Sequence, residues 1–482
     1  MIEGGPGADR RASDIDPSTH RHIESDGMTV RICLFTRDLR LTDNPVLYAA
    51  SAAGRDQVLP VFVHDPGVQA AGFAAPNRLA YLHDCLADLD RGLHGLGSRL
   101  VVRHGPVAQE VARLAADAGA AEVHVAADHS AFARAREERL RAALGDAGVA
   151  LVTHEAVVTA VAPGSVVPSG SDHYAVFTPY LRRWSDAPLR RPLPAPRQLS
   201  TPDRPASDPL PPRPDQDALS PELTPGGETE ARRRGKRWFD RHVDAYDDEH
   251  DALADDLTSR LSPALHFGCL SATELVHRAR KAGTAGAAAF ERQLAWRDFH
   301  HQVLAARPDA ARSDYRSRHD RWRHAPGELE AWEQGRTGYP LVDAGMRQLR
   351  AEGWMHNRAR MITASFLCKT LGLDWRAGAR HFLSLLVDGD VANNQLNWQW
   401  VAGTGTDTRP NRVLNPVTQA KRYDPDGAYV RRWVPELARV GAPAIHEPWK
   451  LPAGLRAELG YPEPLVALDA ALARFRSRRG LD

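Results

Sequence analysis

The sequence predicts two domains: an amino-terminal α/β domain with a doubly wound, Rossmann-like parallel sheet, and a carboxy-terminal all-helical domain. Three observations support this. Short apolar runs alternate with amphipathic stretches up to about residue 160, a proline-rich stretch follows, and helical periodicity dominates from residue 231 onward. Alternating strands and helices favour a parallel sheet covered by helices, and a proline-rich stretch is typical of a linker.

The first domain is expected over residues 28–160. Amphipathic helices are predicted within it, for example over Asn77–Gly95 and Ser130–Gly145. The first strand is followed by Thr36–Arg40 rather than by a glycine-rich turn, which disfavours an ordinary dinucleotide site there. Buried parallel strands are predicted from short runs rich in Val, Ile and Leu: Arg31–Phe35, Val58–Val63, Leu100–Val102, Glu122–Val125 and Ala150–Val152.

Residues 161–230 are predicted to link the domains. Within them, residues 186–230 contain 12 prolines, which exclude helix interiors and central strands and favour an extended path along the surface. Residues 1–27 are polar, and we expect a disordered arm. The helical domain is expected over residues 231–482. In it, Leu341–Leu371 is predicted to form a helix, a glycine-containing turn and a second helix.

Charge is distributed unevenly along the chain, although the net charge is +1. Residues 1–230 hold 23 Lys and Arg against 30 Asp and Glu, a net of −7, whereas residues 231–482 hold 39 against 31, a net of +8. A basic half suggests contact with a polyanion such as nucleic acid; solvated charged faces are the alternative.

Composition also bears on the class of protein. No apolar run reaches the length of a membrane span and the start lacks an apolar signal core, so we expect a cytoplasmic protein. The cysteines (Cys33, Cys85, Cys269 and Cys368) lack metal-ligand spacing, so we expect buried thiols and no metal site. Ten of the 11 tryptophans lie in the second half, which suits a core, a planar cofactor, a base-stacking cleft or an electron relay.

Three segments of the second half concentrate polar side chains. In Gly353–Met361, an Asn, an Arg and a Met share one face of the predicted helix; a solvated arginine stripe is the alternative. Asp388–Trp400 combines carboxylates, amides and indoles, which suit the edges of a flavin and an arginine partner; a metal site and a surface loop are alternatives. Thr258–Pro263 suits either a phosphate or an ordinary helix cap.

Together these segments resemble the cryptochrome/photolyase family, most closely its bacterial class I cyclobutane-dimer branch. The resemblance runs from about Arg31 to Trp449. It implies an antenna-type α/β domain, a helical domain that holds FAD in a U shape, and light-driven repair of cyclobutane pyrimidine dimers in DNA by electron transfer from excited, reduced FAD. The motifs that carry it are Phe35–Asn44, Thr258–Ser262, Gly338–Arg347, Gly353–Met361 and Asp388–Trp400.

Carried over position by position, the resemblance assigns residues to the cofactor. Asn394 would face flavin N5, and Asp388 would pair with Arg360 beside the ring. The residues assigned to the pyrophosphate are Tyr246, Thr258, Ser259, Leu261 and Ser262. Those assigned to the ring system and ribityl chain are Asn357, Arg360, Asp388, Asp390 and Asn394, and further cofactor-binding candidates are Arg260, Arg297 and Gly389.

An antenna chromophore is compatible with the same resemblance. It would be a methenyltetrahydrofolate or an 8-hydroxy-deazaflavin, and the sequence does not decide between them. Arg37, Asp38 and Asp128–Ser130 are the candidates near it.

The resemblance also implies electron-transfer and DNA-binding residues. Trp398, Trp375 and Trp322 match a tryptophan chain from flavin to surface, with plain core tryptophans as the alternative. The expected partner is ultraviolet-damaged DNA, bound by a monomer associated with the nucleoid. Trp296 and Trp400 would form aromatic walls around the lesion. The DNA-binding candidates are Gln293, Trp296, Asn357, Arg358, Met361, Trp400 and Gln419.

Three positions depart from the cyclobutane-dimer pattern: Gln293 stands where Glu is usual, Phe290 where Trp is frequent, and His250 where Arg is frequent. Gln at the first position is a trait of (6-4) photolyases, but those enzymes have His where this chain has Asn357 and Met361. The cyclobutane dimer is therefore favoured. The alternatives are a (6-4) photolyase, a blue-light-sensing cryptochrome without repair, and a flavin-binding DNA module without turnover.

Overall fold

The fold is that of a computed structural model, which describes residues 29–52 and 57–481. The arm predicted over residues 1–27 lies outside the described residues. The first domain contains a five-stranded parallel sheet in the order β3-β2-β1-β4-β5. All predicted strands are confirmed, with ends shifted by one or two residues. Their bounds are β1 Val30–Phe35, β2 Gln57–His64, β3 Val101–His104, β4 Ala120–Ala126 and β5 Ala150–His154.

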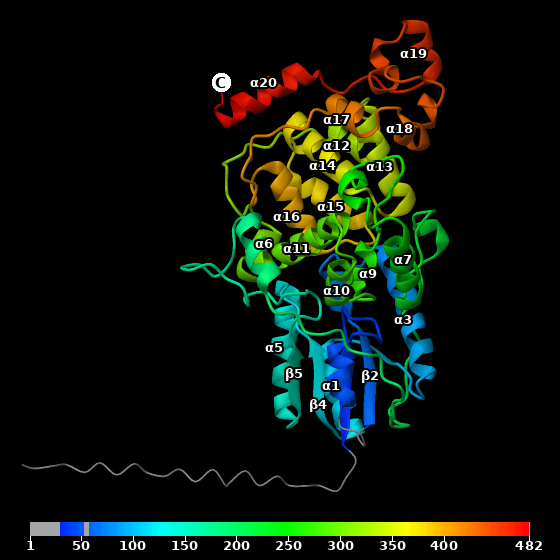
Figure 1. The fold of residues 1–482 in the computed structure, drawn as a ribbon, viewed down its shortest axis with the longest axis vertical. Helices are drawn as coiled ribbons and strands as arrows, with labels where there is room; N and C mark the ends of the chain where they lie inside the picture. Colours follow the sequence, from blue (N-terminus) through cyan, green and yellow to red (C-terminus); the bar gives the residue numbers. More distant parts are fainter. Residues whose placement is uncertain (1–28, 53–56, 482) are drawn as a thin grey trace, which may run out of the picture.

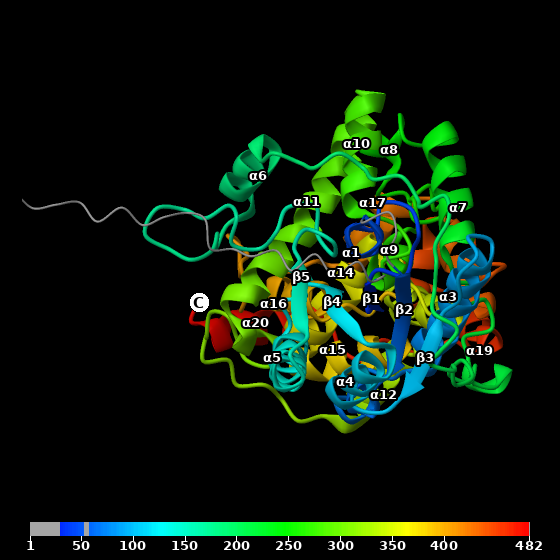
Figure 2. The same cartoon turned by 90° about the horizontal axis from the view of Figure 1, so that it is seen from below.

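Helices cover both faces of the sheet, because alternate side chains of a strand point to opposite sides. Ile32 and Leu34 of β1 pack with apolar side chains of α4 and α5, whereas Cys33 and Phe35 pack with those of α1 and α3. Figure 2 shows the strands in a row with α4 and α5 on one side. The predicted doubly wound domain is therefore confirmed. Its helices are α1 Pro45–Ser51, α2 Pro66–Ala70, α3 Pro76–His94, α4 Val107–Ala118 and α5 Ala131–Asp146.

The predicted linker is partly helical. Helix α6 spans Phe177–Asp186, and a short 3-10 segment, η1, spans Gln216–Ala218. The prolines concentrate after α6, where the chain runs along the first domain. There the backbone N–H of Leu199 donates to Leu96 O and that of Asp208 to Val102 O. Between residues 187 and 230 the chain is extended apart from η1 and Glu228–Glu230, which begin helix α7 (Glu228–Arg241). Helix α6 was not predicted.

The second domain is helical throughout, and Figure 1 shows its helices stacked beyond the carboxyl ends of the strands. Helices α13 and α14 confirm the predicted helix, turn and helix. The α-helices are α7 Glu228–Arg241, α8 Tyr246–Glu249, α9 Ser262–Phe267, α10 Ala272–Ala282, α11 Ala285–Ala306, α12 Pro326–Glu333, α13 Pro340–Glu352, α14 Asn357–Ser365, α15 Trp375–Leu385, α16 Val391–Ala402, α17 Pro416–Tyr423, α18 Ala428–Trp433, α19 Ala453–Leu459 and α20 Leu468–Arg479. Short segments are the π-helix η3 Phe366–Leu371 and the 3-10 turns η2 Pro308–Ala311, η4 Pro435–Leu437, η5 Ala444–His446 and η6 Pro448–Lys450.

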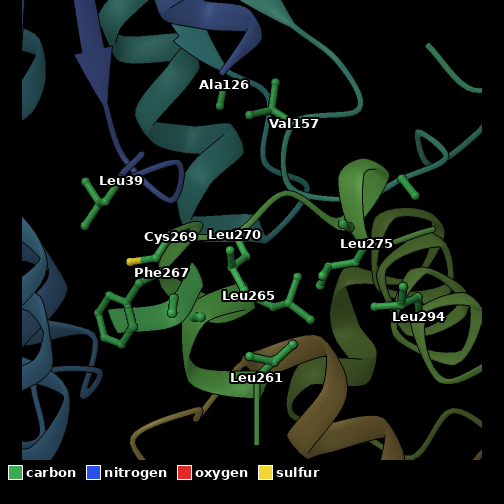
Figure 3. Packing of buried hydrophobic residues seen from close by; sticks show 14 of the residues in the cluster. Leu39, Ala126, Val157, Leu261, Leu265, Phe267, Cys269, Leu270, Leu275 and Leu294 are labelled. Carbon is green, nitrogen blue, oxygen red and sulfur yellow. The ribbon is translucent and has the colours of Figure 1, made fainter. Parts of the chain in front are cut away.

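One apolar cluster joins the two domains. Figure 3 shows Leu39 of the first domain near Phe267 of the second, and both belong to this cluster, as does Val157 of the first domain. The backbones nearly touch at Gly268, where an added Cβ would lie 1.9 Å from Arg37 O. Gly268 also has a φ of +71°, a conformation that favours glycine. The segment after β1 therefore docks directly on the helical domain.

Candidate functional site

A cavity of about 480 Å³ opens within the helical domain. Its walls come from α8, α9, α11, α14, α15 and α16, and from the segments that precede α9 and α16. The fold therefore brings distant stretches of sequence together around one space. The predicted site residues that line it are Tyr246, Thr258, Ser259, Arg260, Leu261, Ser262, Gln293, Trp296, Arg297, Asn357, Arg358, Arg360, Met361, Asp388, Asp390, Asn394, Trp398 and Trp400.

Two predicted binding residues lie away from this lining. Gly389 makes room for Arg78 of α3, since an added Cβ would lie 2.7 Å from the Arg78 Nη1 atom. Gln419 lies on α17 and is partly exposed. The structure thus gives Gly389 a packing role between the domains and leaves Gln419 outside the cavity.

Asp388 and Arg360 form the charge pair that the resemblance implied. The Arg360 Nη2 atom donates to Asp388 Oδ2 at 2.9 Å, and Nη1 donates to Oδ1 at 3.2 Å. Arg360 Nε donates to Met355 O at 2.7 Å, and the Ser262 hydroxyl donates to Asp388 at 2.6 Å. These bonds fix both the cation and the carboxylate at the cavity wall.

The Thr258–Ser262 segment contributes hydroxyl side chains to the lining of the cavity. Thr258 donates to Asp256 at 2.8 Å. Arg260 is already engaged, because its guanidinium pairs with Asp256 and Glu352 and lies over Trp354. Its backbone has a φ of 50°. The Arg260 side chain therefore shapes the segment rather than offering a free cation.

Asp390 joins the cavity to the first domain. Arg37 Nη2 donates to its Oδ2 at 2.5 Å, and Asn393 N donates to its Oδ1 at 2.8 Å. Burial alone would raise the pKa of the Asp390 carboxyl. The imidazoles of His301 and His266 and the charges of Arg37 and Arg297 instead hold this pKa well below its usual range. Asp390 is therefore a fixed anion at neutral pH.

The orientation of the Asn394 amide follows from its neighbours. Its Nδ2 donates to Ala379 O at 3.1 Å and to Gln395 Oε1 at 3.0 Å. Because a carbonyl oxygen only accepts, the nitrogen must face Ala379. The Oδ1 atom is left as the acceptor for a ligand N–H in the cavity.

Two imidazoles in the cavity wall have a buried nitrogen with no hydrogen-bond partner among the described residues: His266 Nδ1 and His300 Nε2. Burial lowers the pKa of His300 to about 4, so its ring is neutral at pH 7. An unpartnered buried polar atom is costly, so a polar ligand that bonds it is favoured. Together with Asn394 Oδ1 and the Asp388–Arg360 pair, these atoms fit the mixed donors and acceptors of FAD.

The three tryptophans predicted to form an electron relay differ in position and exposure. Trp398 lines the cavity and packs so closely on α15 that a Cβ at Gly378 would lie 2.2 Å from its Cη2 atom. Trp375 is fully buried at the start of α15. Trp322 is partly exposed, and the next residue, Arg323, donates its N–H to Gly372 O just before α15. Of the three, Trp322 is the one that reaches the surface.

Sequence reasoning missed a fourth tryptophan. Trp332 is fully buried and lies against Trp398, with ring centroids 6.0 Å apart and planes at 73°. Its indole N–H donates to Thr363 O at 3.0 Å. The sequence around Trp332 has the pattern of an ordinary amphipathic helix, so no local signal could have identified this contact. The contact is seen only in the folded structure.

The rim of the cavity is aromatic and polar. Trp296 stacks on Phe177 of α6, with centroids 3.7 Å apart and planes at 9°. Gln293 is exposed. Arg358 donates to Asp251 at 3.1 Å and lies over the ring of Tyr423. The contribution of Phe177 was not predicted, because α6 itself was not.

The residues proposed near an antenna chromophore instead lie mainly at the domain contact. Arg37 binds both Asp128 and Asp390. Asp38 is fully buried, and its carboxylate accepts from Thr36 N at 2.8 Å. These contacts account for Arg37 and Asp38 without a ligand.

All four cysteines are buried and free, as expected, and Cys85 Sγ lies 3.2 Å from Cys269 Sγ across the domain contact. Over residues 29–52 and 57–481, no three His, Cys, Asp or Glu side chains are grouped as a metal site would require. Within the same ranges, no helix combines the length and the apolar character needed to span a membrane.

Comparison with known proteins agrees with this geometry. A family model described as "DNA photolyase" matches residues 31–197, and one described as "FAD binding domain of DNA photolyase" matches residues 290–479. A relative from Streptomyces griseus, named deoxyribodipyrimidine photo-lyase, is 63% identical over 456 residues, covering 94% of this chain and 100% of the relative.

Solved structures show the same fold. A bacterial class III photolyase from Agrobacterium tumefaciens superimposes with a TM-score of 0.87 at 33% identity, over 94% of this chain and 97% of the other. An archaeal photolyase from Sulfolobus tokodaii, described with two FAD molecules and a novel light-harvesting cofactor, has a TM-score of 0.81 at 32% identity, over 94% and 100%. The sequence motifs, the two-domain fold and these matches agree, and the chain belongs to the cryptochrome/photolyase family.

Proposed function

We propose that this chain is a light-dependent DNA repair enzyme that uses FAD to split cyclobutane pyrimidine dimers. The proposal rests on one juxtaposition: the Asp388–Arg360 pair, the acceptor face of Asn394 and the aromatic side chains of Trp296 and Trp400 share a single cavity. The name of the Streptomyces griseus relative, at 63% identity, supports the same activity.

Residues of the cavity would hold FAD by complementary chemistry. Arg360 presents a cation fixed by Asp388 and Met355 O, and Asn394 Oδ1 would accept an N–H from the ring edge. The hydroxyls of Thr258, Ser259 and Ser262 line the cavity and would bind the pyrophosphate. When bound and fully reduced, FAD supplies an electron that light makes available to the dimer.

The rim would receive the dimer. Trp296 and Trp400 offer apolar ring faces, and the Asn357 and Gln293 amides can donate to base carbonyls. A dimer is weakly stacked and mispaired, so its extrusion from the duplex costs less than that of an ordinary base. Arg358 and the basic second half would meet phosphates. Gln419, outside the cavity, is proposed to contact DNA beyond the lesion.

Trp398, Trp375 and Trp322 are proposed to carry electrons inward and keep the cofactor reduced. Indoles are oxidisable and pack in an apolar interior. The partial exposure of Trp322 would let an external reductant reach the outer end.

Irradiation of the purified holoprotein with blue light, in the presence of an oligonucleotide carrying one thymine dimer, tests the proposal. We expect release of intact thymines that depends on light, and none in the dark. Repair confined to a (6-4) lesion would select the (6-4) activity instead. No repair of either lesion, with a lasting photoproduct, would select a light sensor.

We also propose that the enzyme acts as a monomer, because the cavity and its rim are complete within one chain. Its DNA substrate would place it at the nucleoid. An antenna chromophore, a folate or a deazaflavin, is proposed for the first domain. The Sulfolobus tokodaii structure, described with two FAD molecules and the implication of a novel light-harvesting cofactor, supports looking for one. Extraction and chromatography of the native cofactors would identify it.

A further inference from the structure

The carboxy-terminal helix α20 lies at the end of the molecule farthest from the sheet (Figure 1). One of its last residues, Arg478, places its guanidinium carbon 5.3 Å from the centre of the Trp322 ring. The same guanidinium donates to Gly372 O and to Cys368 O, each at 3.2 Å. These bonds hold a cation at a defined place over the outermost tryptophan of the proposed relay.

Helix α20 is docked firmly at this position. The next residue, Arg479, donates to Asp320 Oδ2 and to Ala402 O, both at 2.8 Å. The Phe475 side chain is buried beneath the helix. The position of Arg478 is therefore part of the fold and does not depend on a loose terminus.

A carboxylate balances the charge of Arg478 only in part. Asp320 is the nearby carboxylate, but its Oδ1 lies 2.8 Å from Arg479 Nε and 4.0 Å from Arg478 Nε. Arg479 is thus the closer partner of Asp320. A guanidinium also stays protonated even where burial lowers its pKa, as burial does for Arg478.

We propose that Arg478 is a positioning residue for the electron supply: its charge makes oxidised Trp322 release the indole proton. The inference rests on the proposed function, in which Trp322 ends the tryptophan series. One electron leaves Trp322 for oxidised Trp375, and an indole radical cation remains. A second cation 5.3 Å away disfavours this charged form.

Proton loss removes the unfavourable charge. The indole N–H bond breaks, and the proton passes to water, which reaches Trp322 because the residue is partly exposed. A neutral indole radical remains until an external thiol returns one electron and the solvent returns the proton. Deprotonation opposes return of the electron along the same path, so Arg478 would raise the yield of lasting reduction.

Transient absorption after a light flash on the holoprotein with oxidised flavin tests the inference. The measured quantity is the lifetime of the indole radical cation before the neutral radical replaces it. In Arg478→Gln we expect this lifetime to lengthen roughly threefold or more. Arg478→Lys should largely restore the wild-type lifetime, because it keeps a cation near the ring.

Two further variants separate charge from docking. Arg474→Gln changes an exposed arginine on the same helix and should leave the lifetime unchanged. Phe475→Ala loosens the packing of α20 and changes no charge near Trp322. If Phe475→Ala lengthens the lifetime as much as Arg478→Gln does, or if Arg478→Gln has no effect, the inference is wrong.

A flavin-free readout makes the test independent of repair. Pulse radiolysis with azide radicals oxidises tryptophans of the apoprotein, and the component lost in Trp322→Phe belongs to Trp322. Its deprotonation should slow in Arg478→Gln there too. Dimer repair by chemically reduced wild-type protein tests the proposed function alone, so the two ideas can fail separately.

Discussion

Gln293 shows how a single side chain can set the chemistry at the rim. It is exposed at the edge of the cavity and can donate a hydrogen bond to a dimer carbonyl, but it cannot supply a proton. In Gln293→Glu, a protonated carboxyl would donate more strongly to the electron-rich dimer, and an ionised one would repel it.

We therefore expect the quantum yield of dimer splitting in Gln293→Glu to exceed that of the wild type at low pH and to fall below it at high pH. The wild-type yield should stay flat over this range. Gln109→Glu, an exposed position on α4 in the other domain, is the matched control. Equal yields for Gln293→Glu and wild type across pH would show that this position does not matter.

His356 links acidity to stability. It caps α14 by accepting from Arg358 N at 3.1 Å, and burial lowers the pKa of its imidazole from 6.5 to about 4. A protonated Nδ1 cannot accept, so the unfolded chain takes up this proton first as pH falls. The contribution of neutral His356 to the free energy of unfolding is therefore complete above pH 6.5 and declines as the pH drops toward 4, by about 2 kcal/mol at pH 5.

His356→Asn keeps a capping acceptor without a titrating ring. We expect this variant to lose less stability between pH 7 and pH 5 than the wild type, measured by urea unfolding at both values. His94→Asn, at an exposed histidine, should behave as the wild type does. If His356→Asn lost as much stability between pH 7 and pH 5 as the wild type does, other buried histidines would be responsible for the pH dependence.

At the scale of elements, the packing of α15 and α16 decides which tryptophan contacts can take part in electron transfer to the flavin. Trp398 contacts Trp332, which is fully buried and whose N–H is bonded to Thr363 O, whereas Trp375 and Trp322 are its proposed partners in electron transfer. A positive charge there has no solvent to release its proton to. Trp332 should therefore be a dead end.

We expect Trp375→Phe to slow photoreduction of the bound flavin more than about tenfold, a barrier increase above 1.4 kcal/mol. Trp332→Phe should leave the rate near the wild-type value, although it alters a direct neighbour of Trp398. The measurement is the rate of flavin bleaching under blue light with excess thiol. A large loss in Trp332→Phe would instead point to a branched path.

Elements with strong local signals could be predicted from sequence. The sheet was predictable because each strand is a short Val- and Ile-rich run, and α13 with α14 because Gly353 marks the turn between them. Helix α6 was missed because the linker was predicted to begin at residue 161, although the proline-rich stretch begins only at residue 186. Pro179 is the single proline of α6 and lies near its start. The packing of Trp332 and Phe177 depends on tertiary contacts that no local pattern encodes.

On the scale of the whole molecule, the site depends on contact between the domains. The motif after β1 suggested an antenna site, yet Arg37 crosses the domain boundary to Asp390 in the cavity wall. The partner of Arg37 is 353 residues away, so sequence could not reveal it. The Arg37–Asp390 ion pair and the apolar cluster shared by the two domains therefore both support the cavity.

Arg37→Gln should accordingly weaken both the fold and the cofactor site. It leaves Asp390, a buried anion, without its closest cation, and the expected loss of unfolding free energy is on the order of 2–4 kcal/mol. FAD should bind roughly tenfold more weakly, about 1.4 kcal/mol, because Asp390 lines the cavity. Urea unfolding and flavin fluorescence titration measure the two effects.

Arg113→Gln, which removes an exposed pair with Glu110 in the same domain, should change stability by no more than about 0.5 kcal/mol. If Arg37→Gln matched that control in both measurements, the domain contact would not support the site.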